Sequence, residues 1–175
     1  CELYLTKPLG VGLFTTAQKR GKLLDEDFQT VRQSMLALND FGTVLSEMEA
    51  VKSITDVTGF GLLGHLSELC EGSGVKATVS FSKVPKLEGL DRYLDLGTMP
   101  GGTTRNFESY GDKVSELTDT WKALLCDPQT SGGLLVAVDP QGRETFLDAA
   151  KSRGLDLTCF GTLSESGDSL ITVTE

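Results

Sequence analysis

The sequence TDVTGFGLLGH occupies residues 55–65 and leads into an apolar helix through a turn rich in glycine. Its three glycines satisfy the spacing GxGxxG, but a dinucleotide-binding unit also needs an acidic residue at the end of the next strand. The next predicted strand, residues 75–81, is followed by Ser82 and Lys83. We therefore predict a glycine-rich turn at the start of a helix here and do not favour dinucleotide binding.

Asp56 stands directly before this turn. Glycines at a helix start, here Gly59 and Gly61, allow backbone N–H groups to approach an anionic ligand. Mg²⁺ prefers hard carboxylate oxygens and commonly bridges to substrate phosphates, so Asp56 is a candidate magnesium ligand. An aspartate at this position can equally accept hydrogen bonds within a turn or helix cap. The spacing alone leaves both interpretations open.

His65 is the only histidine of the chain and follows the turn on the predicted helix. A zinc site would lack ligands there, because neither a second histidine nor a close pair of cysteines accompanies it. We predict a structural role for His65. Ser131, the hydroxyl residue nearest to a second glycine turn, has no histidine near it in sequence, which argues against a serine hydrolase.

Two further segments combine glycines with polar side chains. The first is MPGGTTRNF at residues 99–107. Its Pro-Gly pair suits a type II turn, and its Arg105 and Asn106 side chains could donate hydrogen bonds to a phosphate group. A solvated turn is the alternative. The second, DPQTSGG at residues 127–133, can form an anion-binding nest or can simply lead the chain into the next strand.

Composition predicts one acidic domain over residues 1–175. The chain has 39% hydrophobic residues, a net charge of -9 and a pI near 4.6. This size suits one core, and the negative charge disfavours binding to nucleic acid or an anionic membrane. We find no apolar run of membrane-spanning length. The four cysteines are widely separated, which predicts reduced thiols in a cytoplasmic protein.

Hydrophobic periodicity predicts helices and strands mixed without regular βαβ spacing, which favours an α+β fold. Because the chain opens within a strand pattern, we expect a domain cut from a longer protein. The predicted strands are residues 1–6, 75–81, 134–138, 155–163 and 169–174. The predicted helices are residues 13–21, a long amphipathic helix at 26–48, one ending near residue 72, and residues 87–96, 120–125 and 141–153. We predict a long loop at residues 97–110.

The glycine-rich segments together resemble the selenophosphate synthetase family. The most specific stretches are TDVTGFGLLGHL and LLCDPQTSGGLL, which are long and diverse in composition. The resemblance runs from residue 1 to near residue 170 and includes LTKPLG at 5–10, PKL at 85–87 and PGGTTRN at 100–106. It implies the C-terminal domain of an aminoimidazole ribonucleotide synthetase-like protein, a layered α/β/α sandwich with a mixed sheet.

The family makes selenophosphate from selenide, ATP and water and releases AMP and phosphate. The resemblance implies that Asp56 is a Mg²⁺ ligand, and that the ATP phosphates lie near a wider set of residues in the same segments. That set is Thr58, Gly59, Gly61, Arg105 and Asn106. Similarity to the family also implies a homodimer of the full-length protein.

The resemblance also implies what this chain lacks. The family's reactive cysteine or selenocysteine, its partner lysine and its other metal-binding aspartates lie in an N-terminal half, and Cys1 does not match that reactive residue. We therefore expect no catalytic residue in this chain, and we expect the chain to be inactive alone. The competing hypothesis is a module that binds a nucleotide or a partner without any chemistry.

Overall fold

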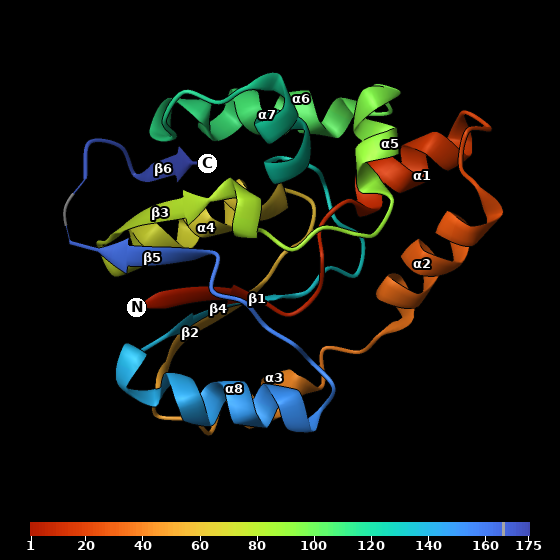
Figure 1. The fold of residues 1–175 in the computed structure, drawn as a ribbon. Helices are drawn as coiled ribbons and strands as arrows, with labels where there is room; N and C mark the ends of the chain where they lie inside the picture. Colours follow the sequence, from red (N-terminus) through yellow and green to blue (C-terminus); the bar gives the residue numbers. More distant parts are fainter. Residues whose placement is uncertain (166) are drawn as a thin grey trace.

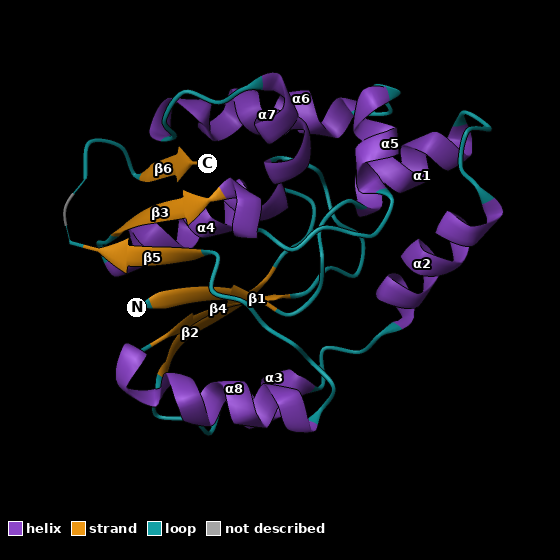
Figure 2. Cartoon of the chain, in the orientation of Figure 1, coloured by secondary structure: helices purple, strands orange, loops and turns teal. Residues whose placement is uncertain are grey.

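The computed structural model describes residues 1–165 and 167–175, which form a mixed β-sheet covered by helices (Figures 1 and 2). The described residues place six strands in the order β2-β4-β1-β5-β3-β6. These strands are β1 (Glu2–Leu5), β2 (Val51–Asp56), β3 (Lys76–Ser80), β4 (Leu134–Val138), β5 (Gly161–Ser164) and β6 (Ile171–Thr174).

Strand β1 lies inside the sheet, between β4 and β5, and is antiparallel to both. Strand β2 pairs antiparallel with the other side of β4, and β3 pairs antiparallel with β5. The β3–β6 pair is parallel. The predicted mixed sheet is therefore confirmed. All five residues of β4 are buried, as its continuous apolar sequence predicts.

Eight α-helices surround the sheet in the described part of the chain. The helix predicted at residues 13–21 corresponds to the first, and the helix predicted after the glycine turn corresponds to the fourth. No helix within the described residues is long and apolar enough to cross a membrane. The helices are α1 (Val11–Lys19), α2 (Asp25–Leu36), α3 (Phe41–Leu45), α4 (Gly61–Ser73), α5 (Leu90–Asp95), α6 (Gly101–Tyr110), α7 (Asp119–Leu125) and α8 (Arg143–Ser152).

Successive residues of β1 divide the core into two layers, because side chains of a strand alternate between the faces of its sheet. Tyr4 packs with Phe41 of α3 and Phe146 of α8 on one face. Leu3 and Leu5 point to the larger cluster on the other face, which contains residues of α1, α4 and α7. Figure 1 shows these two groups of helices on opposite sides of the sheet. The α/β/α layering is thus confirmed.

The prediction of one long helix at residues 26–48 is wrong. Helix α2 ends at Leu36, and the chain resumes helical geometry only at α3. Ala37 between them is extended, and its carbonyl accepts a hydrogen bond from the buried Lys7. Leu38, expected on the apolar face, is 82% exposed. Because of this break, α3 lies on the Tyr4 face of the sheet. Helix α2 stays beside α1, beyond the end of the sheet (Figure 1).

The prediction of a loop at residues 97–110 is also wrong, because most of that segment forms α6. Pro100 precedes the helix and Gly101 opens it, so the expected type II turn is absent. Proline is compatible with a helix start because its missing N–H group has no partner there. Thr103, Asn106 and Tyr110 are buried at steps of three and four, which is the signature of one helical face.

The predicted strand at residues 155–163 is shorter than expected. Regular pairing begins only at Gly161, and the preceding segment is irregular. Leu155 and Leu157 nevertheless pack against the α8 side of the core. Their apolar character therefore reflects burial beside a helix, which a short sequence pattern cannot distinguish from burial in a sheet.

A buried carboxylate in the segment at residues 127–133 positions α1. The N-cap of that helix is Gly10, which offers no side-chain cap. The Gly12 N–H group donates instead to Asp127 Oδ2 at 2.9 Å, and the Gly10 and Val11 N–H groups donate to Gln129 Oε1 at 3.3 and 3.2 Å. Gln129 Nε2 also donates to Asp127 Oδ2. Two side chains distant in sequence therefore satisfy the first N–H groups of α1.

The same segment packs tightly against two other parts of the chain. A Cβ atom on Gly132 would overlap the Val57 carbonyl, and one on Gly133 would overlap the backbone of Lys7. Ser131 has a φ of 51°, in the left-handed region that non-glycine residues seldom occupy. Close backbone packing, more than conformational freedom, explains why glycine occupies both positions.

We predict that Asp127 makes the chain less stable as the pH rises from about 4 to about 7. Burial raises the pKa of this carboxyl from 3.8 to about 7, although hydrogen bonds from Gln129 and the backbone oppose the shift. The folded state then holds a proton that the unfolded state releases, so stability falls between about pH 4 and 7. Asp127→Asn cannot ionise, and it should reduce the loss of unfolding free energy between about pH 5 and 8 by about 1–3 kcal/mol.

Urea unfolding of both proteins across this pH range measures the effect. Asp156→Asn is the matched control, because Asp156 is exposed and its neutralisation should leave the pH dependence nearly unchanged. The same pH dependence in wild type and Asp127→Asn would contradict the prediction.

We predict that Gly132→Ala destabilises the chain by about 2–4 kcal/mol, because the new methyl group forces the backbone contact with Val57 apart. Gly72→Ala is the control. Gly72 lies in α4 with nothing within 4 Å of its Cβ position, so alanine should stabilise the helix by up to about 1 kcal/mol. Thermal unfolding of the two variants compares them. Equal stabilities would show that the contact tolerates a side chain.

Candidate metal and phosphate site

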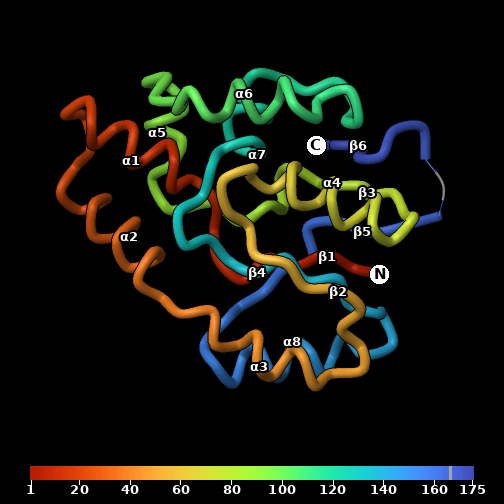
Figure 3. The backbone as a smooth tube through the Cα atoms, turned by 180° about the vertical axis from the view of Figure 1, so that it is seen from behind, coloured from red at the N-terminus to blue at the C-terminus, as the bar shows by residue number. Residues whose placement is uncertain are grey.

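The structure brings the three glycine-rich segments together around the turn at residues 57–60. The Val57 N–H group donates to the Gly133 carbonyl at 2.8 Å, and the Gln129 N–H group donates to the Thr58 carbonyl at 3.0 Å. From α6, the Asn106 amide donates to the Gly59 carbonyl at 2.8 Å. Figure 3 shows the segment after β2 and the segment before β4 side by side, ahead of α4. Each neighbouring segment therefore fixes part of the turn.

Asp56 is the last residue of β2, where it pairs with Leu134 of β4. Its side chain is exposed, and it makes no hydrogen bond or ion pair to any residue that the structure describes. The interpretation of Asp56 as a local turn or cap acceptor is therefore not supported by the geometry. Its backbone is held by the sheet while its carboxylate stays available to a ligand.

Helix α4 begins at Gly61 with a φ of 72°. Glycine adopts this left-handed value without strain, and a side chain there would also meet the backbone of Cys126. No side chain caps the helix, whose N-cap residue is Phe60. The Tyr110 hydroxyl donates to the Phe60 carbonyl at 2.7 Å, so α6 holds the helix entry from its other side. This start is rigid and has no competing side-chain acceptor.

Gly59 differs from Gly61 because it is exposed and has nothing within 4 Å of its Cβ position. A ligand can approach the backbone at this position without meeting protein atoms. Thr58 is half-buried, and its carbonyl accepts hydrogen bonds from the Gln129 and Gly61 N–H groups. Thr58 thus offers a hydroxyl group to a ligand, and Gly59 offers accessible backbone.

Arg105 and Asn106 are neighbours on α6 but face different surroundings. Arg105 is exposed, makes no ion pair within the described residues, and its guanidinium lies near the helix start at Gly101. Asn106 is buried, and its amide nitrogen donates to the Gly59 and Cys126 carbonyls. The Asn106 amide, predicted to donate to a phosphate, therefore already donates to the backbone of the turn. The Arg105 guanidinium remains available.

His65 is 8% exposed and lies one turn into α4. Its Nε2 atom lies 3.2 Å from the Thr58 hydroxyl oxygen, and its Nδ1 atom lies 3.2 Å from a Glu68 carboxylate oxygen. The structural role expected for His65 is thus to connect helix α4 to the turn. Spacing indicates only the contact between His65 and Glu68, which are three residues apart on α4; Thr58 lies in the turn before the helix, so its contact depends on the fold.

Sequence reasoning missed the buried roles of Asp127 and Gln129. An anion-binding nest and a bend into a strand were both open for their segment, but neither predicts polar side chains that cap α1. Asp127 is 0% exposed, and its Oδ1 atom has no hydrogen-bond partner among the described residues. The sequence carried little signal for this burial, because aspartate is seldom fully buried unless it is paired.

The donor chemistry of the site fits Mg²⁺ only in part. A free carboxylate and a nearby hydroxyl are hard oxygen donors of the kind that this ion prefers. Within residues 1–165 and 167–175, however, no group of three or more histidine, cysteine, aspartate or glutamate side chains is placed to hold a metal ion. Asp56 can therefore supply one ligand, and the remaining ligands must come from phosphates, water or another part of a longer protein.

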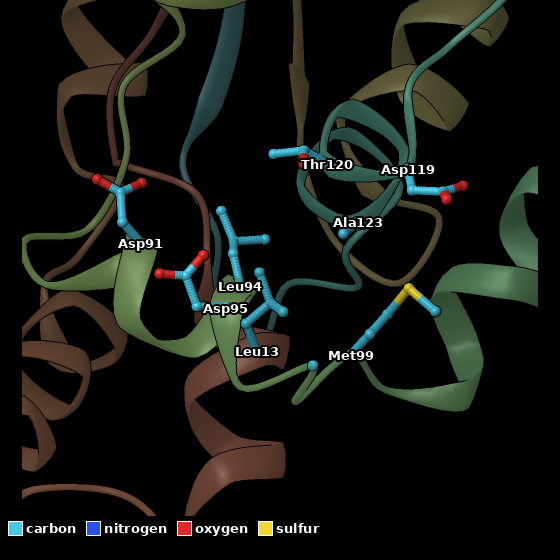
Figure 4. A pocket seen from close by; sticks show the side chains of 9 residues that line it. Leu13, Asp91, Leu94, Asp95, Met99, Asp119, Thr120 and Ala123 are labelled. Carbon is cyan, nitrogen blue, oxygen red and sulfur yellow. The ribbon is translucent and has the colours of Figure 1, made fainter.

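A separate pocket of about 420 Å³ lies between α1, α5 and α7 and contains none of the predicted site residues (Figure 4). Asp91, Asp95 and Asp119 line it beside Leu13, Leu94 and Met99. An acidic and apolar lining disfavours phosphate, which requires cationic or N–H donors. The pocket and the turn at residues 57–60 are therefore distinct features of the surface.

Residues 1–173 match the family described as AIR synthase related protein, C-terminal domain. The chain is 51% identical over 173 residues to selenide, water dikinase of Haemophilus influenzae, an alignment that covers 99% of this chain and 50% of that protein. It is 54% identical over 165 residues to selenide, water dikinase of Pseudomonas putida, covering 94% of this chain and 48% of that protein.

Solved structures with the same fold include two kinds of protein. Thiamine-monophosphate kinase from Stenotrophomonas maltophilia has a TM-score of 0.66 at 16% identity, covering 98% of this chain and 49% of that one. The E. coli hydrogenase maturation protein HypE has a TM-score of 0.62 at 20% identity, covering 99% of this chain and 46% of that one. At these identities the likeness concerns the fold.

The chain spans about half the length of the curated relatives that it matches. Its own residues are matched almost completely, and the family match leaves out only the last two of them. The two helical layers, the glycine turn before α4 and the mixed sheet, except Thr174 at the end of β6, lie within the matched range. This chain belongs to the AIR synthase related protein family, as a C-terminal domain of that family.

Proposed function

We propose that this chain is the C-terminal domain of an enzyme that phosphorylates selenide. The whole protein would convert selenide, ATP and water into selenophosphate, AMP and phosphate. Support comes from relatives that are more than half identical to the chain and are named selenide, water dikinase. The observation that carries the local proposal is the unpartnered Asp56 carboxylate at the end of β2, beside an open glycine turn.

In this proposal Asp56 supplies one oxygen ligand to a Mg²⁺ ion that accompanies ATP. Bound Mg²⁺ neutralises negative charge that develops on the phosphates during phosphoryl transfer. The strand backbone holds Asp56 in place, so its carboxylate needs little reorganisation to meet the ion. This geometry suits a residue that binds and orients, and does not require it to exchange a proton.

The turn and α6 would line the phosphate side of the same site. Gly59 allows close approach to the backbone, and Gly61 starts α4 without a competing side-chain cap. Arg105 offers a planar pair of N–H donors that matches a phosphate group. Asn106 would contribute through the turn that it anchors, since its amide nitrogen is already engaged.

The reactive groups of the reaction would come from the other half of the longer protein. Burial raises the pKa of the Cys70 and Cys126 thiols to about 11, so neither supplies a thiolate near neutral pH. All four cysteines are unpaired, which suits the reducing cytoplasm that we propose as its location. We also propose that the longer protein forms a homodimer, on the family resemblance alone.

We predict that Asp56→Asn in the longer protein raises the Mg²⁺ concentration required for half-maximal ATP binding by about tenfold or more. The amide keeps the size of the side chain but removes the charge that attracts the cation, and one lost charged contact is worth about 1.5–3 kcal/mol. Calorimetric titration of ATP at a series of Mg²⁺ concentrations measures the change.

Asp148→Asn provides the matched control for this substitution, because Asp148 is exposed on α8, which packs on the opposite face of the sheet. It should leave the Mg²⁺ requirement unchanged. If Asp56→Asn and Asp148→Asn behave alike, the assignment of Asp56 as a metal ligand is wrong.

We predict that the 175-residue chain alone does not consume ATP in a selenide-dependent reaction. It holds one candidate metal carboxylate, and burial raises the pKa of its Cys70 and Cys126 thiols, so the proposal places the reacting groups in the other half of the longer protein. Measurement of AMP release with and without selenide, using the chain and the longer protein at equal concentrations, is the test. Selenide-dependent turnover by the chain alone would overturn the proposal, and tight Mg²⁺–ATP binding without turnover by either protein would favour a binding module.

A further inference from the structure

Thr58, His65 and Glu68 form a continuous chain of hydrogen-bonding groups from the glycine turn to the surface of α4. The Thr58 hydroxyl oxygen and His65 Nε2 lie 3.2 Å apart, and His65 Nδ1 and a Glu68 oxygen also lie 3.2 Å apart. The imidazole is 8% exposed, whereas the Glu68 side chain is 66% exposed. The ring is therefore held between one partner in the site and one partner at the surface.

The chemistry of Thr58 and Glu68 determines which His65 nitrogen carries a hydrogen. An ionised carboxylate accepts hydrogen bonds and donates none, so the His65 nitrogen that faces Glu68 must carry a hydrogen. In a neutral imidazole the other nitrogen then has a lone pair and can only accept. The Thr58 hydroxyl has one hydrogen, and it must donate that hydrogen to Nε2 for this contact to form.

We propose that His65, oriented by Glu68, is a positioning residue that turns the Thr58 hydroxyl into an acceptor facing the cation beside Asp56. With its hydrogen directed at the ring, the oxygen presents only lone pairs to the rest of the site. Such an oxygen suits Mg²⁺ or a water molecule bound to it, and repels a phosphate oxygen. The inference rests on the proposed function, because it assigns Thr58 to the metal side of that same site.

The remaining contacts of Thr58 leave its hydroxyl as the only group that His65 can control. Its carbonyl already accepts hydrogen bonds from the Gln129 and Gly61 N–H groups, so the backbone of the turn is fixed independently. A threonine side chain has few accessible χ1 positions. Loss of the His65 contact should therefore free the hydroxyl hydrogen without unfolding the turn.

The simpler interpretation is that His65 is a buried ring whose two nitrogens are merely satisfied. Phe60 packs against it edge-on at 5.9 Å between ring centres, so packing also contributes to its position. The two interpretations differ in one respect. A purely structural ring has no fixed consequence for metal affinity, whereas a positioning ring does.

The ring itself provides a direct test, since His65 is the only histidine and its nuclear magnetic resonance signals need no assignment. In the 175-residue chain with ¹⁵N-labelled histidine, the proposal requires a hydrogen on Nδ1 and a lone pair on Nε2. Glu68→Gln should mix the two tautomers, and the control Glu71→Gln, one turn along the same helix, should not. A hydrogen on Nε2 in the unaltered chain would overturn the proposal.

Metal dependence in the longer protein provides the second test, measured by ATP binding and not by turnover. Thr58→Val keeps the shape of the side chain and removes the oxygen, and His65→Leu removes the ring that orients it. Each should raise the half-saturating Mg²⁺ concentration about three- to tenfold, as for the loss of one hydrogen-bonding contact. His65→Gln, whose carbonyl oxygen can reach the Nε2 position, should restore most of the affinity.

The outcomes separate this inference from the proposed function. If Asp56→Asn raises the Mg²⁺ requirement while Thr58→Val does not, Asp56 remains a metal ligand and the role of Thr58 is wrong. If His65→Leu weakens binding and His65→Gln weakens it equally, packing of the ring matters and its hydrogen bond does not. Either result rejects the positioning role. If Asp56→Asn has no effect, the proposed metal site itself fails, whatever tautomer the ring adopts.

Discussion

The buried Asp127 carboxyl and its partner Gln129 fix the relation between the first helix and the rest of the molecule. Helix α1 starts at a glycine and would otherwise leave its first N–H groups without a side-chain acceptor. Burying a carboxyl is costly, and the pKa raised to about 7 reflects that cost. The Gly12 N–H group and the Gln129 side-chain amide, which both donate to this carboxyl, offset it in part. The segment at residues 127–133 is consequently held on one side by α1.

On its other side the same segment holds the glycine turn, so the constraint reaches the candidate site through the backbone. The Gln129 N–H group bonds to Thr58 and the Gly133 carbonyl to Val57, while Gly132 packs directly on the turn. Asp56 and Thr58 thus owe their positions to main-chain contacts made by other segments. Their side-chain oxygens take no part in these main-chain contacts, which is a condition for using them on a ligand.

Sequence patterns predicted the elements whose burial follows a single period. The uniformly apolar β4 and the glycine-started α4 are examples. The mixed sheet and its two helical layers were implied by the family resemblance and not by the pattern. The pattern failed where distant contacts decide. An uninterrupted apolar stripe at residues 26–48 cannot reveal that Lys7 binds the Ala37 carbonyl and that the helix breaks there. In α6, the glycines and polar residues concealed a helix because its buried face includes Thr103 and Asn106.

The segments of the candidate site could be identified from sequence, but the separate roles of their residues could not. All its motifs were visible, and the structure separates their polar groups into two classes. Asn106, Asp127, Gln129 and His65 are buried and already bonded, so they shape the turn. Asp56 and Arg105 are exposed and make no ion pair within the described residues, with carboxylate and guanidinium groups suited to a cation and a phosphate respectively. In the proposed site these two opposite charges, Asp56 at the end of β2 and Arg105 on α6, would meet a ligand that carries both, such as a nucleotide with its metal ion.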